Sequence, residues 1–426
     1  MAADQPNLPN SPFLTENEPN FGHLSFEAGR VFTPGSPLNE RDLFAGRSEQ
    51  VDQIINAISQ KGYHAVLYGD RGVGKTSLSN VLVEFLSDLG QDMFLMPRAN
   101  CDASDDFTSL WKKVLRGISL THSHSGMGFT AEAIRTSQSV VETLPESITP
   151  DDVRCALEEL SVGNSMILIF DEFDRLKNKI TTVMMADTIK SLSDHGVDAT
   201  IMLIGVADSV DALIGEHQSV ERALVQVRLP RMSRKEVQQI VTKGTTKLGL
   251  GVTKGALNEI GALSQGLPYV THLLALHTSR EALGRKSLTL ELQDVQSGVK
   301  QSLGQWQQSV ITTYHNATHS HQPENIFKEV LAACALASQD ETGYFSAAAV
   351  RHPLRLITGK NYDIPNFARH LNEFTKPERG AILQRTGETR RVRYRFDSPL
   401  IKPYIVMRSV ADKRLTREVM EEIGHD

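Results

Sequence analysis

The chain has 426 residues, enough for about two to four domains and at least one large buried core. Apolar residues make up 40 % of the chain and charged residues 23 %, which excludes a disordered or fibrous protein. The three cysteines, Cys101, Cys155 and Cys334, lie far apart without a CxxC spacing, so the sequence suggests neither a disulfide framework nor a structural zinc site. A reducing, cytoplasmic location is therefore expected.

The first residues have the composition of an extended segment. Four prolines lie within the first 22 residues, and neither the basic start nor the apolar stretch of a signal peptide is present. The longest apolar runs, such as Met166–Phe170, are about five residues, far short of the roughly 20 that span a bilayer. We expect a disordered or extended arm over residues 1–37 and no membrane partner.

A glycine-rich segment, GDRGVGKT, follows the β-prone run His64–Tyr68 and precedes a helical pattern. The glycines permit positive φ and close backbone approach, so that successive N–H groups and the helix N-terminus can surround a polyphosphate. In this pattern Lys75 would reach the β- and γ-phosphates of the bound polyphosphate, and Thr76 would ligate Mg²⁺. The predicted phosphate-binding residues are Gly69, Asp70, Arg71, Gly72, Val73, Gly74, Lys75, Thr76 and Ser77.

An acidic pair follows the continuous apolar run Met166–Phe170, which is typical of a strand buried on both faces. Because open α/β sheets bind ligands at the carboxyl ends of their strands, we expect Asp171 beside the phosphate loop. There Asp171 would hold Mg²⁺ through water, and Glu172 would polarise the water that attacks the γ-phosphate.

Two more segments, Asp92–Ala99 and Ala199–Ala207, complete the predicted sheet. The alternation of strand and helix predicts a parallel, doubly wound α/β sheet with right-handed crossovers. The second segment ends in Asp208 and Ser209, where a polar group could sense the γ-phosphate. A helix N-cap explains this pair equally well.

With these residues the chain resembles the AAA+ ATPases, and within them the origin-recognition and initiator-like group that grades into the STAND signalling ATPases. Gly46–Arg47 resembles the adenine-side box of that family. The initiator group usually has Asn where this chain has Asp208, and a sensor Arg where this chain reads Gly266-Leu267-Pro268. The latter resembles the Gly-x-Pro turn through which the STAND lid touches nucleotide, which implies contact by Pro268.

The resemblance implies ATP and Mg²⁺ as ligands, ATP hydrolysis, and a nucleotide-dependent homo-oligomer. It also implies an arginine finger that a neighbouring subunit supplies to the site. Arg222 is the best positional match, with Arg228 and Arg231 as alternatives. A solvated helix arginine or an intramolecular ion pair explains Arg222 as well.

The C-terminal part reads as three helices and a hairpin, the pattern of a winged helix. Residues 376–417 contain twelve Lys and Arg against four Asp and Glu, a local charge of +8 in a chain whose net charge is −6. A basic segment on an acidic body points to a polyanion such as duplex DNA, or is only a solvated face. The arginines expected along the wing are Arg385, Arg390, Arg391, Arg393 and Arg395.

The predicted fold is therefore an α/β P-loop core with a helical lid and a winged-helix domain. The expected boundaries are an arm over residues 1–37, an AAA+ core over 38–232, a lid over 233–302, a linker helix over 303–325, a winged helix over 326–410 and a helical tail over 411–426.

Two functions follow from these observations. The first is a DNA-associated, ATP-dependent molecular switch that hydrolyses ATP to ADP and phosphate. The second is a STAND-like signalling or defence regulator, in which the winged helix binds a partner protein and hydrolysis is slow.

Overall fold

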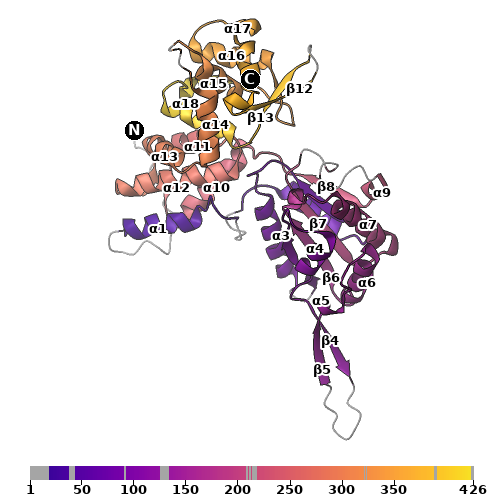
Figure 1. Ribbon diagram of the computed structural model, residues 1–426. Coiled ribbons are helices and arrows are strands. Elements are labelled where there is room, and N and C mark those ends of the chain that lie inside the picture. The colour runs from indigo at the N-terminus through magenta and orange to yellow at the C-terminus, as the bar shows by residue number, and fades with distance from the viewer. Residues whose placement is uncertain are drawn as a thin grey trace.

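The computed structural model describes residues 19–37, 44–90, 93–124, 134–207, 210, 213, 218–320, 322, 324–387 and 391–423. These residues form two lobes, one built on a β-sheet and the other mostly helical (Figure 1). Across the described ranges, the structure contains no helix that is both long and apolar enough to cross a membrane.

A parallel sheet forms the centre of the first lobe. Its strands run in the order β2-β6-β7-β1-β8, with β3 also paired to β6, and every pairing is parallel. They are β1 (His64–Tyr68), β2 (Phe94–Leu95), β3 (Arg98–Asn100), β6 (Ser165–Asp171), β7 (Ala199–Gly205) and β8 (Leu224–Arg228). The predicted parallel α/β sheet is confirmed, although the strand expected over Asp92–Ala99 is divided into two short strands.

Helices cover both faces of this sheet because its central strands are apolar on both sides. Ile167 and Ile169 of β6 pack with Leu78 of α3 on one face, whereas Leu168 and Trp111 belong to the core of the other. The elements around the sheet are α2 (Ser48–Ile58), α3 (Lys75–Leu89), α4 (Phe107–Val114), α5 (Val140–Thr143), α6 (Pro150–Leu160), η2 (Phe173–Arg175), α7 (Lys179–His195) and α9 (Gln218–Glu221).

An antiparallel ribbon, β4 (Ser119–His124) and β5 (Ile134–Ser139), projects away from the sheet (Figure 1). The sequence analysis does not predict it, because its residues show no apolar alternation that would mark a buried strand face.

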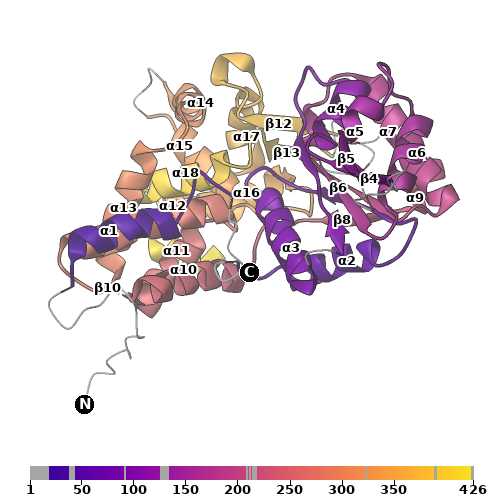
Figure 2. The same ribbon diagram turned by 90° about the horizontal axis from the view of Figure 1, so that it is seen from below.

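The second lobe begins with helices that pack around α12. They are α10 (Arg234–Leu248), α11 (Lys254–Leu263), α12 (Pro268–Gly284) and α13 (Leu292–Gly304), with a short parallel pair formed by β9 (Gly251–Val252) and β10 (Thr289–Leu290). Helix α1 (Phe21–Val31) lies along α10 and α12 (Figures 1 and 2), and it buries Leu24, Ala28 and Val31. The arm predicted for residues 1–37 is therefore wrong over α1, because an apolar side chain about once per turn lets this segment pack as a helix.

The C-terminal part contains the predicted three helices and hairpin, and a third strand joins the hairpin in the order β11-β13-β12. Its elements are α14 (Gln308–Thr318), α15 (Phe327–Leu336), β11 (Phe345–Ser346), α16 (Ala347–Thr358), α17 (Ile364–Glu373), η3 (Pro377–Arg379), β12 (Leu383–Thr386), β13 (Arg393–Phe396), α18 (Ile401–Ala411) and α19 (Arg417–Ile423). Buried side chains of α18 join the same core as those of α12 and α15.

The packing of Phe32, which follows α1, against Gly244 predicts that replacing this glycine by alanine destabilises the protein. A Cβ on Gly244 would lie 2.3 Å from Cε1 of Phe32, whereas one on Gly255 would meet nothing within 4 Å. We expect Gly244→Ala to destabilise the protein by about 1 kcal/mol or more, because overpacking outweighs the gain in helix propensity. Gly255→Ala should instead be neutral or stabilising by up to about 1 kcal/mol. Urea unfolding of the two variants checks this, and equal unfolding midpoints would contradict it.

Candidate active site

A cavity of about 820 Å³ lies where the two lobes meet. The first lobe supplies residues 71–77 and the end of β6, and the second supplies the start of α12 and residues just before α18. The residues that line it include Phe44, Ala45, Arg47, Lys75, Thr76, Asp171, Glu172, Asp174, Arg175, Met232, Ile240, Pro268, Tyr269, His272 and Leu400.

The glycine-rich loop joins β1 to α3 through backbone conformations that favour glycine. Gly69, Gly72 and Gly74 have φ values of 149°, 83° and 96°. A Cβ on Gly69 would lie 2.4 Å from the carbonyl oxygen of Leu229, so that no side chain fits there. Gly74 is the N-cap residue of α3 and provides no side-chain cap. The first-turn N–H groups of α3 therefore have no capping side chain as acceptor, the arrangement that binds anions at helix N-termini.

Lys75 is the first residue of α3, and its ammonium group lies folded back over the loop. Its Nζ donates to the carbonyl oxygens of Gly69 and Asp70, each at 2.9 Å, and the residue is only 9 % exposed. Burial lowers the pKa of Lys75 to about 8, a shift that the nearby carboxylates of Asp174, Asp70 and Asp171 partly oppose. A lysine at this position stays cationic at neutral pH.

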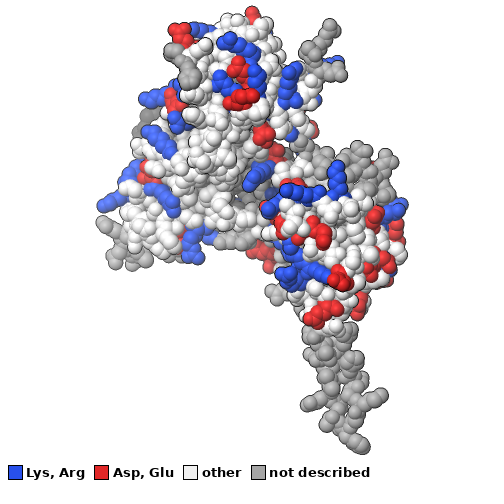
Figure 3. All heavy atoms as spheres, in the orientation of Figure 1, with Lys and Arg blue, Asp and Glu red and all other residues white. Residues whose placement is uncertain are grey.

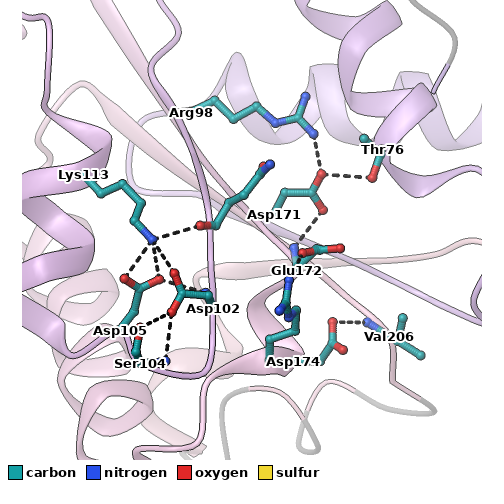
Figure 4. Close-up of polar contacts among 12 residues, drawn as sticks. Thr76, Arg98, Asp102, Ser104, Asp105, Lys113, Asp171, Glu172, Asp174 and Val206 are labelled. Atoms are coloured by element: carbon teal, nitrogen blue, oxygen red, sulfur yellow. Dashed lines mark hydrogen bonds and ion pairs between the residues drawn. The ribbon is translucent and has the colours of Figure 1, made fainter. Parts of the chain in front are cut away.

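Asp171 is buried at the end of β6 and receives three hydrogen bonds (Figure 4). Oδ2 accepts from the Thr76 hydroxyl at 2.9 Å and forms an ion pair with Arg98, while Oδ1 accepts from the backbone N–H of Glu172 at 2.8 Å. The hydroxyl and carboxylate oxygens brought together here are hard ligands of the kind that Mg²⁺ prefers. The predicted pairing of Thr76 and Asp171 therefore fits a magnesium ion.

Arg98 contacts Asp171, and the sequence analysis does not identify it. It belongs to β3, which lies beside β6, and its guanidinium also donates to the amide oxygen of Asn80. The sequence shows only an arginine near the end of a predicted strand. Such an arginine is usually solvated, so nothing in the sequence indicates its contact with Asp171.

Glu172 has a left-handed backbone conformation, with φ of 56°, and its side chain is half-exposed. The carboxylate accepts from the guanidinium of Arg175 at 2.7 Å. Nearby, Asp174 accepts from the backbone N–H of Val206 at 2.7 Å, which ties the end of β7 to the segment after β6 (Figure 4). Glu172 thus borders the cavity, but its carboxylate is bonded to a neighbour on its own segment.

Arg47 is buried and holds the cavity wall together. Its guanidinium donates to the carbonyl oxygens of Pro230 at 2.6 Å and Val73 at 3.4 Å, and its backbone N–H donates to Glu236. Burial lowers the pKa of Arg47, and the charge of Glu236 partly offsets this effect. The residue predicted for the adenine side therefore connects the phosphate loop to α10 and to the segment between β8 and α10.

Pro268 is the first residue of α12 and reaches the phosphate loop. Its Cγ is 3.8 Å from the position that a Cβ on Gly74 would occupy. Gly266, with φ of 74°, would place a Cβ 2.6 Å from the carbonyl oxygen of Met232, so this turn requires glycine. The turn before α12 therefore brings Pro268 to the cavity, together with Tyr269 and His272, which the sequence analysis does not identify.

The candidate arginine fingers lie outside this cavity. Arg222 has a 75 % exposed side chain that forms an ion pair with Asp194 at 2.7 Å. Arg228 bonds Glu341. Asp208 and Ser209 lie outside the described residues.

Arg231 links the phosphate loop to the C-terminal part. Its Nε lies 3.5 Å from a carboxylate oxygen of Asp70, and one terminal nitrogen donates to the carbonyl oxygen of Pro399 at 3.3 Å. Asp70 and Gly69 line a neighbouring cavity of about 660 Å³ rather than the main one. Leu400, next to Pro399, lines the main cavity, so both lobes shape the site.

Comparison with solved structures gives distant similarities. The chain is similar to Cdc6p from Pyrobaculum aerophilum, with 15 % identity, a TM-score of 0.44, and 91 % of this chain and 99 % of that chain covered. It is also similar to the ORC2 protein of Aeropyrum pernix, with 14 % identity, a TM-score of 0.49, and coverages of 93 % and 98 %. A Walker-type ATPase of Pyrococcus abyssi is similar with 14 % identity and a TM-score of 0.49, and the match covers 88 % of this chain and 99 % of that chain.

The comparison with curated proteins gives no match. The family model described as novel STAND NTPase 1 matches residues 37–371. This match begins before the phosphate loop and extends into α17, and it confirms the STAND features predicted from the Gly-x-Pro turn. The chain therefore belongs to the novel STAND NTPase 1 family.

Proposed function

We propose that this chain is a nucleotide-dependent molecular switch that binds ATP with Mg²⁺ and hydrolyses it to ADP and phosphate. The observation that carries the proposal is the 2.9 Å contact between Thr76 and Asp171, beside the buried ammonium of Lys75. This arrangement combines a hard-oxygen metal site with a cation at the N-terminus of a helix.

Each group then has one role in hydrolysis. Lys75 exchanges its carbonyl acceptors in the loop for the β- and γ-phosphate oxygens, and Thr76 and Asp171 hold the Mg²⁺ ion. When bound, that ion neutralises phosphate charge. Glu172 leaves Arg175, orients a water molecule in line with the γ-phosphate and accepts its proton.

We also propose that Arg222 acts in a neighbouring copy of the chain. All three arginines contact a carboxylate of their own chain, but the side chain of Arg222 is 75 % exposed, against 37 % for Arg228 and 27 % for Arg231, which favours Arg222 for reaching another subunit. Mixing Glu172→Gln and Arg222→Ala proteins tests this, because shared sites would restore part of the ATP turnover that each variant lacks alone.

The switch is proposed to act on duplex DNA through a winged helix formed by α15 to α17 and the β12–β13 hairpin. Arg385 and Arg391 are exposed on this hairpin, and Arg390 lies outside the described residues. On the face drawn in Figure 3, basic side chains over the C-terminal part alternate with acidic ones. Such a mixed surface supports only a few phosphate contacts, and thus a shallow dependence of DNA affinity on salt.

A partner protein is the second candidate, because two wing arginines are already bonded within the chain. Arg393 forms an ion pair with Asp340 at 2.7 Å, and the guanidinium groups of Arg393 and Arg395 lie over the ring of Tyr344. Membership of a STAND family also favours a regulator whose winged helix binds protein.

ATP turnover with and without duplex DNA over a salt series separates the two candidates. Stimulation that fades with salt, and that is lost in an Arg385→Glu/Arg391→Glu variant, supports the DNA switch. The matched control is Lys61→Glu/Lys190→Glu, which makes the same charge change on exposed residues of the first lobe. Tight ATP binding with negligible turnover in both conditions supports the partner-regulated switch.

The lowered pKa of Lys75 predicts a pH dependence of ATP binding. The cationic form binds phosphate, and with a pKa of about 8 in the nucleotide-free protein this form is lost as pH rises above 8. ATP affinity should therefore be nearly constant below about pH 7, fall by about twofold by pH 8, and fall by up to about tenfold per unit above it, with proton uptake on binding. Calorimetric titrations in two buffers of different ionisation enthalpy measure both effects. The same pH dependence in Lys75→Ala would contradict this assignment.

A further inference from the structure

Arg98 does not line the main cavity, but it contacts a carboxylate that the proposed magnesium site uses. The register of β3 and β6 places Arg98 opposite Ile169, two residues before Asp171. Because alternate residues of a strand share a face, these three side chains lie on one face of the sheet. Ile169 packs in the same core as residues of α3, so this is the face that α3 covers. Arg98 therefore approaches Asp171 from the neighbouring strand, beneath α3.

The guanidinium of Arg98 is held by acceptors on two different elements (Figure 4). Nη2 donates to Oδ2 of Asp171, and Nη1 donates to the amide oxygen of Asn80. Asn80 lies one helical turn after Thr76 on α3, and the Thr76 hydroxyl donates to the same Oδ2. The arginine, the carboxylate and one face of α3 thus form a single network that fixes the position of Asp171.

The charge of Arg98 matters because Asp171 is buried. Asp171 is only 4 % exposed, whereas the side chain of Arg98 is 27 % exposed. A buried carboxylate is costly unless hydrogen bonds and an opposite charge compensate it, and Arg98 supplies that charge in direct contact. A divalent cation held by the same carboxylate would compensate it as well, but the guanidinium would repel that cation. Arg98 and a metal ion therefore compete for Asp171.

We propose that Arg98 is a positioning residue for Asp171 that lowers the affinity of this carboxylate for divalent cations, so that the site binds Mg²⁺ weakly without nucleotide. The inference rests on the proposed function, because it takes Thr76 and Asp171 as the residues that hold Mg²⁺. Proteins usually bind Mg²⁺ through one or two carboxylates together with substrate phosphates. The phosphates of ATP then supply the negative charge that the guanidinium offsets, which makes metal binding depend on the nucleotide.

The first test measures metal affinity directly in the full-length, nucleotide-free protein, with Mn²⁺ as the probe and electron paramagnetic resonance as the readout. The binding that is lost in Asp171→Asn identifies the site. Arg98→Gln removes the charge and keeps a hydrogen-bond donor, and it should bind Mn²⁺ at this site about tenfold more tightly than the wild type. Arg98→Lys keeps the charge and should bind Mn²⁺ close to the wild-type affinity.

Thermal unfolding separates this role from a merely structural one. Removal of one partner of a buried ion pair leaves an uncompensated charge, so Arg98→Gln should unfold below the wild-type temperature in EDTA. A ligand stabilises the native state more when it binds more tightly. Added Mg²⁺ should therefore raise the unfolding temperature of Arg98→Gln more than that of the wild type.

Arg285→Gln is the matched control for unfolding. The side chain of Arg285 is 33 % exposed and bonds the buried carboxylate of Asp294 at 2.7 Å, and neither residue lines the main cavity. This variant should also be destabilised in EDTA, but Mg²⁺ should raise its unfolding temperature no more than it raises that of the wild type.

The possible failures are distinguishable. If Arg98→Gln binds Mn²⁺ no more tightly than the wild type, or if Mg²⁺ stabilises both proteins equally, the role of Arg98 is overturned and the proposed function stands. An Arg98→Gln protein that is unfolded in EDTA should fold when Mg²⁺ is added, and its failure to do so also overturns that role. If Asp171→Asn loses neither Mn²⁺ binding nor affinity for ATP with Mg²⁺, the proposed metal site fails, and the role of Arg98 fails with it.

Discussion

Glu172→Gln is expected to reduce ATP turnover by at least about a hundredfold while ATP remains bound. The amide keeps the size of the side chain but cannot accept the proton of the attacking water, and positioned general bases contribute factors of about 10² to 10⁴. The side chain borders the cavity and bonds Arg175 rather than the glycine-rich loop proposed to bind the phosphates. Single-turnover and steady-state assays of ATP hydrolysis, together with a direct ATP-binding titration, measure the two effects separately.

Glu142→Gln makes the same chemical change on an exposed residue of α5, outside the cavity, and should keep wild-type turnover. The loss in Glu172→Gln could also come from the broken ion pair with Arg175. Thermal unfolding addresses this, because an exposed pair contributes about 1 kcal/mol or less, and the variant should unfold near the wild-type temperature. Comparable losses of ATP affinity and of turnover in Glu172→Gln would contradict the assigned role.

Lys75→Ala is expected to weaken ATP binding by about 10- to 100-fold, the value of one or two charge-assisted hydrogen bonds. The variant removes the only lysine that lines the main cavity within the described residues. It also frees the carbonyl oxygens of Gly69 and Asp70, which accept from its ammonium group. An ATP titration of the variant measures the effect.

Lys112→Ala is a matched control, because its Nζ donates to a backbone carbonyl, that of Glu146, away from the cavity. It should bind ATP as the wild type does. Turnover of Lys75→Ala at saturating ATP gives a second readout, because a residue that binds the ground state and the transition state equally would leave that turnover unchanged. An ATP affinity equal to that of the wild type would remove Lys75 from the phosphate site.

The parts of the site that the sequence predicts are those encoded locally. The loop at residues 69–76 specifies its turn through glycines at fixed offsets, and the next helix begins at Lys75. Asp171 is predictable for a related reason, because a run of apolar residues marks a strand buried on both faces. The acidic residue at its end then lies at the ligand-binding edge of the sheet.

The parts that it does not predict depend on contacts between distant segments. Arg98 reaches Asp171 only because β3 and β6 are neighbours, and a strand arginine carries no sign of that pairing. His272 has the helical spacing of a core residue and packs against Phe32 like one, and only its place in the cavity lining distinguishes it. Helix α1 lies in a proline-rich N-terminal region, and that composition predicts an extended segment. The short apolar pattern that packs the helix on α12 is too weak to change this prediction.

Arg231 bridges the phosphate loop and the start of α18, so the conformations of these two segments are coupled. Asp70 belongs to the loop and Pro399 to the segment before α18, and Arg231 contacts both. A molecule that displaces α18 and breaks this bridge changes nucleotide affinity by some factor. By thermodynamic linkage, the nucleotide changes the affinity for that molecule by the same factor. The strength with which ATP or ADP alters binding of a candidate partner is therefore a direct measure of how far that partner acts on the loop.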